Sequence, residues 1–216
     1  FTNIPLLKDY STTGLPLIIS CGMANLSEIQ QTLKAIGSLE NYPTILMLTT
    51  SEYPTMPMNV NLLKLETLSK SFPNIPLGYS DHTQGILAST IAVALGAKVF
   101  EKHFTLDKNL SGPDHWFSED PEGLKNWVDS IRTATTMLGS EEVKPTEKEE
   151  KTKILARRSV VALSDIKPGE SFNQNNIGLR RPGNGLSAIM IEEIFGKKST
   201  KKISKGDLPK SGDFIS

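Results

Sequence analysis

Two histidines follow two apolar segments of the chain at equivalent places. His82 comes three residues after Tyr79 at the end of one segment, and His103 comes three residues after Phe100 at the end of the next. The carboxyl ends of parallel strands are where α/β proteins build their sites, because the loops there are free of the packing that fixes the other end. Two imidazoles at neighbouring strand ends can share one metal ion, and with no firm third ligand they favour a catalytic ion over a closed structural one. The alternative is that each histidine is a structural or surface residue.

Acids, hydroxyls and a cation lie near both histidines in the sequence. Such groups can hold an anionic, oxygen-rich ligand beside a metal ion, although ordinary loop polarity would also place them there. They are Ser51, Glu52 and Tyr53 after an earlier apolar run, and Ser80, Asp81, Glu101, Lys102, Thr105, Asp107 and Asp114. Cys21 has no histidine nearby in the sequence, so we do not expect it to act as a nucleophile.

The elements that must position these residues are four apolar runs that alternate with helical patterns. The apolar runs cover residues 16–20, 44–50, 75–79 and 97–100, and the helical patterns cover residues 26–36, 61–72, 85–95 and 121–138. Four strand–helix units in series predict parallel strands covered by helices. They are either half of an eight-unit barrel or a small open sheet, and periodicity does not choose between these two folds.

The pattern changes after residue 139. Between residues 141 and 153, nine of thirteen residues are charged, which predicts a linker or a solvated connecting segment. Beyond it, short strand patterns at residues 158–163 and 177–181 and one short helix at residues 187–195 indicate a small β-rich domain.

Composition excludes several classes of protein. The 216 residues include 24 Lys plus Arg and 24 Asp plus Glu, so the formal net charge is zero. The charge balance therefore does not favour a nucleic-acid or anionic-membrane partner. The single cysteine forms no internal disulfide, the sequence contains no apolar run of membrane length, and we expect no secretory leader. We therefore expect a cytoplasmic protein. Because the chain opens at Phe1 and runs at once into structured sequence, we also expect it to be part of a longer protein.

Seven motifs in this order resemble the sialic acid (N-acetylneuraminate) synthase family, which includes synthases of related bacterial nonulosonic acids. The matching segments are residues 19–24, 51–54, 78–83, 94–97, 101–107, 112–115 and 181–185. The most specific pair is YSDH at residues 79–82 and EKHFT at residues 101–105, whose histidines are 21 residues apart. The resemblance implies an α/β fold, the C-terminal half of a TIM (β/α)8 barrel (residues 1–139), then a charged linker (140–156) and a small β-rich SAF (antifreeze-like, β-clip) domain (157–216).

The resemblance also implies an activity. In that family, phosphoenolpyruvate condenses with N-acetylmannosamine or a related N-acyl sugar aldehyde. The products are sialic acid or another nonulosonic acid and phosphate, and they serve surface polysaccharide biosynthesis. The implied cofactor is a divalent ion, Mn²⁺ or Mg²⁺, and the implied assembly is a domain-swapped homodimer.

By the same resemblance, each candidate residue has a role. The implied metal ligands and catalytic residues are His82 and His103; the implied phosphoenolpyruvate contacts are Ser51 and Ser80; the implied sugar contacts are Tyr53 and Asp114. Arg181 matches the arginine that the SAF domain of one subunit places in the partner's active site, where it binds substrate and takes part in catalysis. Its fixed donors suit N-acetyl and hydroxyl oxygens better than a lysine would.

Two departures from the family pattern carry expectations of their own. The family's first four strand–helix units, with a phosphate-binding lysine, a serine and a catalytic acid, would precede Phe1, so we expect the 216 residues alone to be inactive. The segment His115-Trp116-Phe117-Ser118 differs from the lysine-alanine-serine motif of sialic acid synthases, so the identity of the acceptor sugar is left open. The alternatives are another metal-dependent aldolase-like barrel, or a carbohydrate-binding SAF module on an inert fragment.

Overall fold

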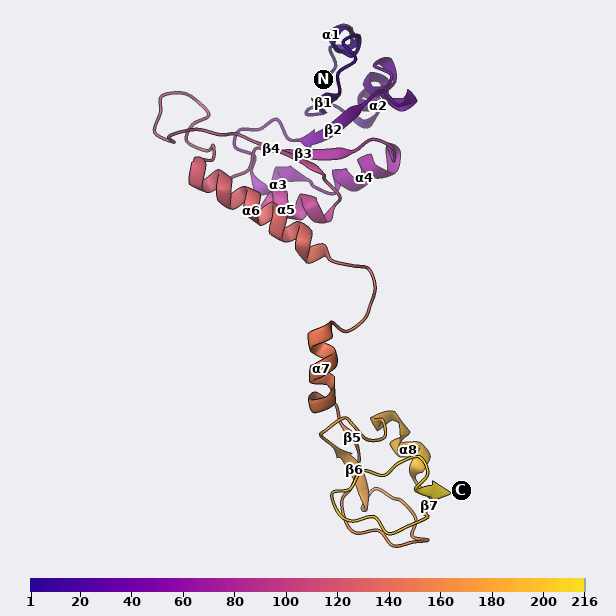
Figure 1. Ribbon diagram of the computed structural model, residues 1–216. Coiled ribbons are helices and arrows are strands. Elements are labelled where there is room, and N and C mark those ends of the chain that lie inside the picture. The colour runs from indigo at the N-terminus through magenta and orange to yellow at the C-terminus, as the bar shows by residue number, and fades with distance from the viewer. Residues whose placement is uncertain (216) are drawn as a thin grey trace. The chain divides into compact units, whose positions relative to one another are not determined.

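The computed structural model describes residues 1–215, which fall into two compact units. The first unit is Phe1–Ser140 and the second is Glu141–Ser216. Figure 1 colours the first from indigo to salmon and the second from orange to yellow. Each unit has its own core of buried apolar residues and is described by itself.

The first unit is built on a curled sheet of four parallel strands (Figure 1). The strands are β1 (Leu17–Ser20), β2 (Thr44–Thr49), β3 (Leu77–Asp81) and β4 (Val99–Lys102), and they pair in chain order. The parallel strands predicted from the apolar runs are thus confirmed, and the curled sheet is consistent with part of a TIM barrel. In the register, Thr49 lies opposite Ser80, and Ser80 lies opposite Glu101.

Helices cover one face of this sheet, as predicted. They are α2 (Leu26–Ala35), α4 (Lys64–Ser71), α5 (Leu87–Ala94) and α6 (Pro121–Leu138). Asn25 and Glu28 form a capping box at the start of α2, and the Asp120 carboxylate caps α6 by accepting from the Gly123 N–H at 2.8 Å. Buried side chains of α2, α4 and α5 form the core with Leu46, Leu48 and other strand residues. Within residues 1–215, no helix is long and apolar enough to cross a membrane.

Three short elements of the first unit were not predicted. They are α1 (Ile4–Ser11), the 3-10 turn η1 (Ser38–Glu40) and α3 (Pro57–Val60). η1 and α3 span about one turn each, which is too short for apolar residues to show a helical period. No residue of α1 is buried, so no core-facing stripe marks that helix.

The second unit contains two small antiparallel pairs of strands. β5 (Ser159–Ala162) pairs with β6 (Ile177–Arg180), and β7 (Lys198–Ser199) pairs with β8 (Phe214–Ile215). The predicted helix over residues 187–195 is instead a 3-10 turn, η2 (Ala188–Met190), followed by the single turn α8 (Ile191–Ile194).

The segment predicted as a charged linker contains a helix, α7 (Glu147–Ala156), that the sequence analysis did not place. Thr146 and Glu149 form a capping box at its start, and none of its residues is buried. Glu150 pairs with Lys153 one turn later, at 2.8 Å between Oε1 and Nζ. Capping and charge pairs along the helix, without an apolar face, stabilise α7 locally.

Replacing Phe172 with alanine is expected to destabilise the second unit. The Phe172 side chain is 1% exposed and lies in that unit's core with Ile166, Ile177 and Ile194. Loss of a fully buried phenylalanine costs about 3–5 kcal/mol, which lowers the unfolding midpoint in urea. The matched control is Ile189→Ala, because Ile189 is 81% exposed and its loss should leave the midpoint almost unchanged. Equal midpoints for the two variants would contradict the assignment of this core.

Candidate active site

The two histidines lie together at the carboxyl end of the sheet. β3 ends at Asp81 and β4 ends at Lys102, so each histidine directly follows its strand. Their ring centres are 5.1 Å apart, with the ring planes almost perpendicular. The ring of Tyr53 lies 4.3 Å from that of His82 and 5.6 Å from that of His103, centre to centre. The structure therefore brings His82, His103 and Tyr53 into one cluster.

His82 is held in one tautomer by the backbone. Its Nδ1 lies 2.8 Å from the carbonyl oxygen of Thr50, and a carbonyl only accepts, so Nδ1 carries the proton and donates. Nε2 then keeps its lone pair in the neutral ring. Burial is the largest cause of a pKa for His82 below its ordinary value, which favours the neutral ring. A neutral imidazole with a free Nε2 and a carbonyl on Nδ1 is the form that binds metal ions.

Ser80 and Asp114 join the histidine cluster from two sides. The Ser80 hydroxyl donates to Oε1 of Glu101 at 2.7 Å, and Ser80 Oγ lies 3.5 Å from Nε2 of His82. Because the hydroxyl proton goes to Glu101, the lone pair of His82 Nε2 is not used by Ser80. Asp114 lies beside the other ring, with 3.8 Å between its Oδ2 and Nδ1 of His103.

Ser51 and Arg181, the other two predicted site residues, have different contacts. Ser51 is exposed in the loop after β2 and its side chain lies against the backbone of Gly22, where a Cβ atom would collide with it. No direct contact between Ser51 and the histidine cluster is recorded among residues 1–215. Arg181 belongs to the second unit, where its Nε donates to the carbonyl oxygen of Ala156 at 2.9 Å.

Glu101 was predicted only as one of the polar groups near the histidines, without a role of its own, and Phe117 was not predicted at the site, yet both contact the cluster. Glu101 accepts from Ser80, and the Phe117 ring lies 5.1 Å from that of His103. Glu101 had a readable signal in the sequence, because it stands two residues before His103 as Ser80 stands two residues before His82. In adjacent parallel strands this equal spacing pairs the two residues. Phe117 had no such signal, because a loop brings it to the site.

The residues of the cluster fit a divalent cation. Two imidazoles with ring centres 5.1 Å apart lie close enough to bind one ion, and the carboxylates of Glu101 and Asp114 are near them. Within the described part of the chain, no group of three or more His, Cys, Asp or Glu side chains is arranged to hold a metal. An ion bound here would thus have two imidazole ligands, with its other positions left to water or substrate.

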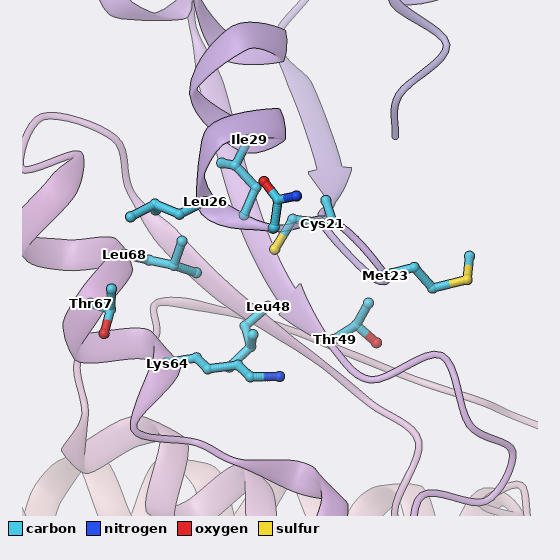
Figure 2. Close-up of a pocket in the computed structure, with 11 residues that line it drawn as sticks. Cys21, Met23, Leu26, Ile29, Leu48, Thr49, Lys64, Thr67 and Leu68 are labelled. Atoms are coloured by element: carbon cyan, nitrogen blue, oxygen red, sulfur yellow. The ribbon is translucent and has the colours of Figure 1, made fainter.

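A separate cavity of about 380 Å³ lies between α2 and α4 (Figure 2). Its walls are mainly apolar side chains of these helices and of β2, with Lys64 and Thr67 on α4. Cys21 borders it and is 4% exposed. Burial raises the pKa of the Cys21 thiol above its ordinary value, and a thiol that stays protonated is a poor nucleophile. This supports the expectation that Cys21 is not catalytic.

Two known protein families match the chain, one in each part. Residues 1–143 match the NeuB family, and residues 157–208 match the SAF domain. The chain belongs to the NeuB family. The two matches fall on the two units of the NeuB chain, one on each, and the family is the one that the sequence motifs indicated.

Relatives of this NeuB chain include named synthases. It is 43% identical over 210 residues to the N,N'-diacetyllegionaminic acid synthase of Legionella pneumophila, covering 95% of this chain and 58% of that protein. It is 40% identical over 208 residues to the N-acetylneuraminate-9-phosphate synthase of Homo sapiens, covering 95% of this chain and 57% of that protein. A solved structure, the spore coat polysaccharide biosynthesis protein of Bacillus subtilis, matches with a TM-score of 0.60 and 32% identity, over 99% of this chain and 64% of that one. The chain thus spans less than two thirds of these relatives.

Proposed function

We propose that this chain is the C-terminal part of a nonulosonic acid synthase, comprising half of a TIM barrel and an SAF β-clip domain. The enzyme would condense phosphoenolpyruvate with an N-acyl sugar aldehyde and release phosphate. The observation that carries the proposal is the pair His82 and His103, with rings 5.1 Å apart at neighbouring strand ends. The names of the relatives, which are synthases of legionaminic acid and of a sialic acid phosphate, support it.

His82 and His103 would hold Mn²⁺ or Mg²⁺ in this enzyme. When bound, such an ion polarises an aldehyde oxygen as a Lewis acid. The Thr50 carbonyl fixes the His82 tautomer, so that Nε2 stays unprotonated and can bind the ion. Tyr53 covers the His82 ring and limits access of water from that side.

The hydroxyl and carboxylate groups around the histidines would bind the two substrates. Ser80 and Ser51 are assigned to phosphoenolpyruvate, and Tyr53 and Asp114 to the sugar. Ser80 is 2% exposed and hydrogen-bonded, so its hydroxyl is fixed in direction. Tyr53 is 52% exposed, which leaves its ring and hydroxyl free to meet a sugar. Carboxylates such as that of Asp114 accept from sugar hydroxyls.

Arg181 is assigned to the active site of a partner subunit in a domain-swapped homodimer. Among residues 1–215 its guanidinium makes one hydrogen bond, from Nε to the carbonyl oxygen of Ala156, so its two terminal nitrogens keep donors for a substrate oxygen. Arg158 and Arg180 border the same 400 Å³ hollow as Arg181, which makes this surface strongly cationic. An oxygen-rich, anionic substrate would be attracted to such a surface.

A phosphate-release assay tests the proposed activity. The full-length product of the gene is incubated with phosphoenolpyruvate, Mn²⁺ and a panel of N-acyl hexosamines, and inorganic phosphate and product mass are measured. We expect phosphate release that depends on the sugar and is lost when the metal is removed by a chelator. Absence of phosphate release with every sugar would contradict the proposal, and release without a sugar would indicate hydrolysis rather than condensation.

The 216 residues alone are expected to be inactive in the same assay. Condensation requires two substrates held in reacting geometry, and the positioning of a bimolecular step contributes about 7–11 kcal/mol to catalysis. The relatives are longer than this chain, and the proposal assigns part of that positioning to the additional segment. Turnover by the 216 residues alone, at a rate near that of the full-length product, would show that this assignment is wrong.

A further inference from the structure

A buried ion pair joins the two residues that precede the histidines in the sequence, Asp81 and Lys102. Nζ of Lys102 is 3.2 Å from Oδ2 of Asp81, and the two side chains are 2% and 0% exposed. Asp81 is the last residue of β3 and Lys102 is the last residue of β4, so each charge immediately precedes one of the histidines. The exposed pair of Lys70 and Glu66 on α4 shows the ordinary surface arrangement, with side chains 77% and 48% exposed.

The pair holds the backbone of Thr83, the residue that follows His82. Oδ1 of Asp81 accepts from the backbone N–H of Thr83 and from its hydroxyl, both at 2.8 Å. Nζ of Lys102 donates to the carbonyl oxygen of Thr83 at 2.6 Å. The residue before His82 is thus bonded to the residue after it, and both are bonded to the residue before His103.

The covering helices anchor the same pair. Oδ2 of Asp81 accepts from the Ser89 hydroxyl on α5 at 2.6 Å, and that hydroxyl accepts from the indole N–H of Trp127 on α6 at 2.9 Å. Ser89 is fully buried and Trp127 is 5% exposed. The position of the Asp81 carboxylate is therefore set by two helices as well as by two strands.

Stability alone does not account for charges at this place. Replacing a buried ion pair with apolar side chains of similar volume is often neutral or stabilising, whereas removing one partner is strongly destabilising because it leaves an uncompensated buried charge. What an apolar pair would not supply is the set of directional bonds to Thr83. Those bonds fix how far apart, and in what orientation, the two strand ends present their next residues.

We infer that Asp81 and Lys102 are positioning residues, which hold His82 and His103 at the separation that one divalent cation requires. The inference rests on the proposed metal site. Neither side chain needs to touch the ion, because the pair acts through the backbone at residues 81–83 and 102–103. Loss of the pair is expected to weaken metal binding even where the fold is kept.

Mn²⁺ binding to the full-length gene product, followed by electron paramagnetic resonance of the free ion, tests this inference. The variants are Asp81→Asn, Lys102→Met and the double variant that carries both changes. The matched control is Glu66→Gln with Lys70→Met, which removes the exposed pair on α4. The urea midpoint of unfolding is measured for each variant. Mn²⁺ binding is compared under conditions in which each variant is folded.

We expect each single variant to lower both the midpoint and the Mn²⁺ affinity, the affinity by about tenfold or more, as for other residues that orient metal ligands. The double variant leaves no lone buried charge, so its midpoint should recover, while its Mn²⁺ affinity should stay low because Lys102→Met removes the donor to the Thr83 carbonyl.

Should a single variant fail to fold, the double variant decides. Wild-type affinity in the folded double variant would overturn the positioning role. A wild-type protein that binds no Mn²⁺ would instead overturn the proposed metal site itself.

Discussion

Replacing His82 with alanine is expected to abolish metal-dependent phosphate release while leaving most of the fold intact. The change removes Nε2 of His82 and with it one of the two proposed imidazole ligands. Loss of an interaction on which the transition state depends typically lowers the rate by several powers of ten. The side chain is 7% exposed and lies outside the apolar core of the first unit, so we expect a stability loss of about 1–2 kcal/mol. Activity, bound Mn²⁺ and the urea midpoint are measured together.

His82→Asn is the matched control for that experiment. The Nδ2 amide of asparagine takes nearly the place of Nδ1 and donates to the Thr50 carbonyl, but asparagine has nothing in the place of Nε2. If His82 acts as a metal ligand, the asparagine variant should be as inactive as the alanine variant and more stable. Recovery of activity with asparagine would mean that His82 serves the Thr50 hydrogen bond instead. Full activity and normal metal content in the alanine variant would rule the assignment out.

Mixing two inactive subunits is expected to restore activity. One subunit carries Arg181→Ala and the other carries His82→Ala, and each homodimer has no complete site. If Arg181 serves the partner's site, one of the two sites in a mixed dimer combines an intact histidine pair with an intact arginine. Random pairing makes about half of the dimers mixed, so about a quarter of wild-type activity should return, from a background of almost none.

The opposite result has an equally clear meaning. If Arg181 serves the site of its own chain, each site of the mixed dimer carries one defect and activity stays absent. Formation of mixed dimers is verified with a different affinity tag on each subunit. A control mixture of Arg181→Ala with itself, treated in the same way, sets the background. Absence of activity with mixed dimers present would contradict the domain-swapped assembly and leave the chemistry of the histidine site untouched.

Local sequence determined the elements of the first unit and the place of the two histidines. Four apolar runs predicted the strands, and the helical patterns that follow them predicted α2, α4, α5 and α6. The reason is that strand and helix periods, and the bonds that end them, act within a few residues. Because parallel strands end at one edge, His82 and His103 were placed together before any contact was known. The single turn α3 escaped prediction because so short a segment shows no period, and α1 escaped it because none of its residues is buried and no core-facing stripe marks it.

The contacts that make the histidine pair usable were decided only by tertiary structure. The Thr50 carbonyl that fixes the His82 tautomer lies 32 residues away in the chain, and the Ser89 hydroxyl that holds Asp81 is itself bonded to Trp127, 38 residues further on. Lys102 and Asp81 were predicted either as groups that help to hold a ligand or as ordinary loop polarity, and the structure buries them as an ion pair. No local pattern distinguishes an exposed lysine from a buried one. Burial depends on which strands pair, in which register, and on which helices cover them, and those are properties of the whole fold.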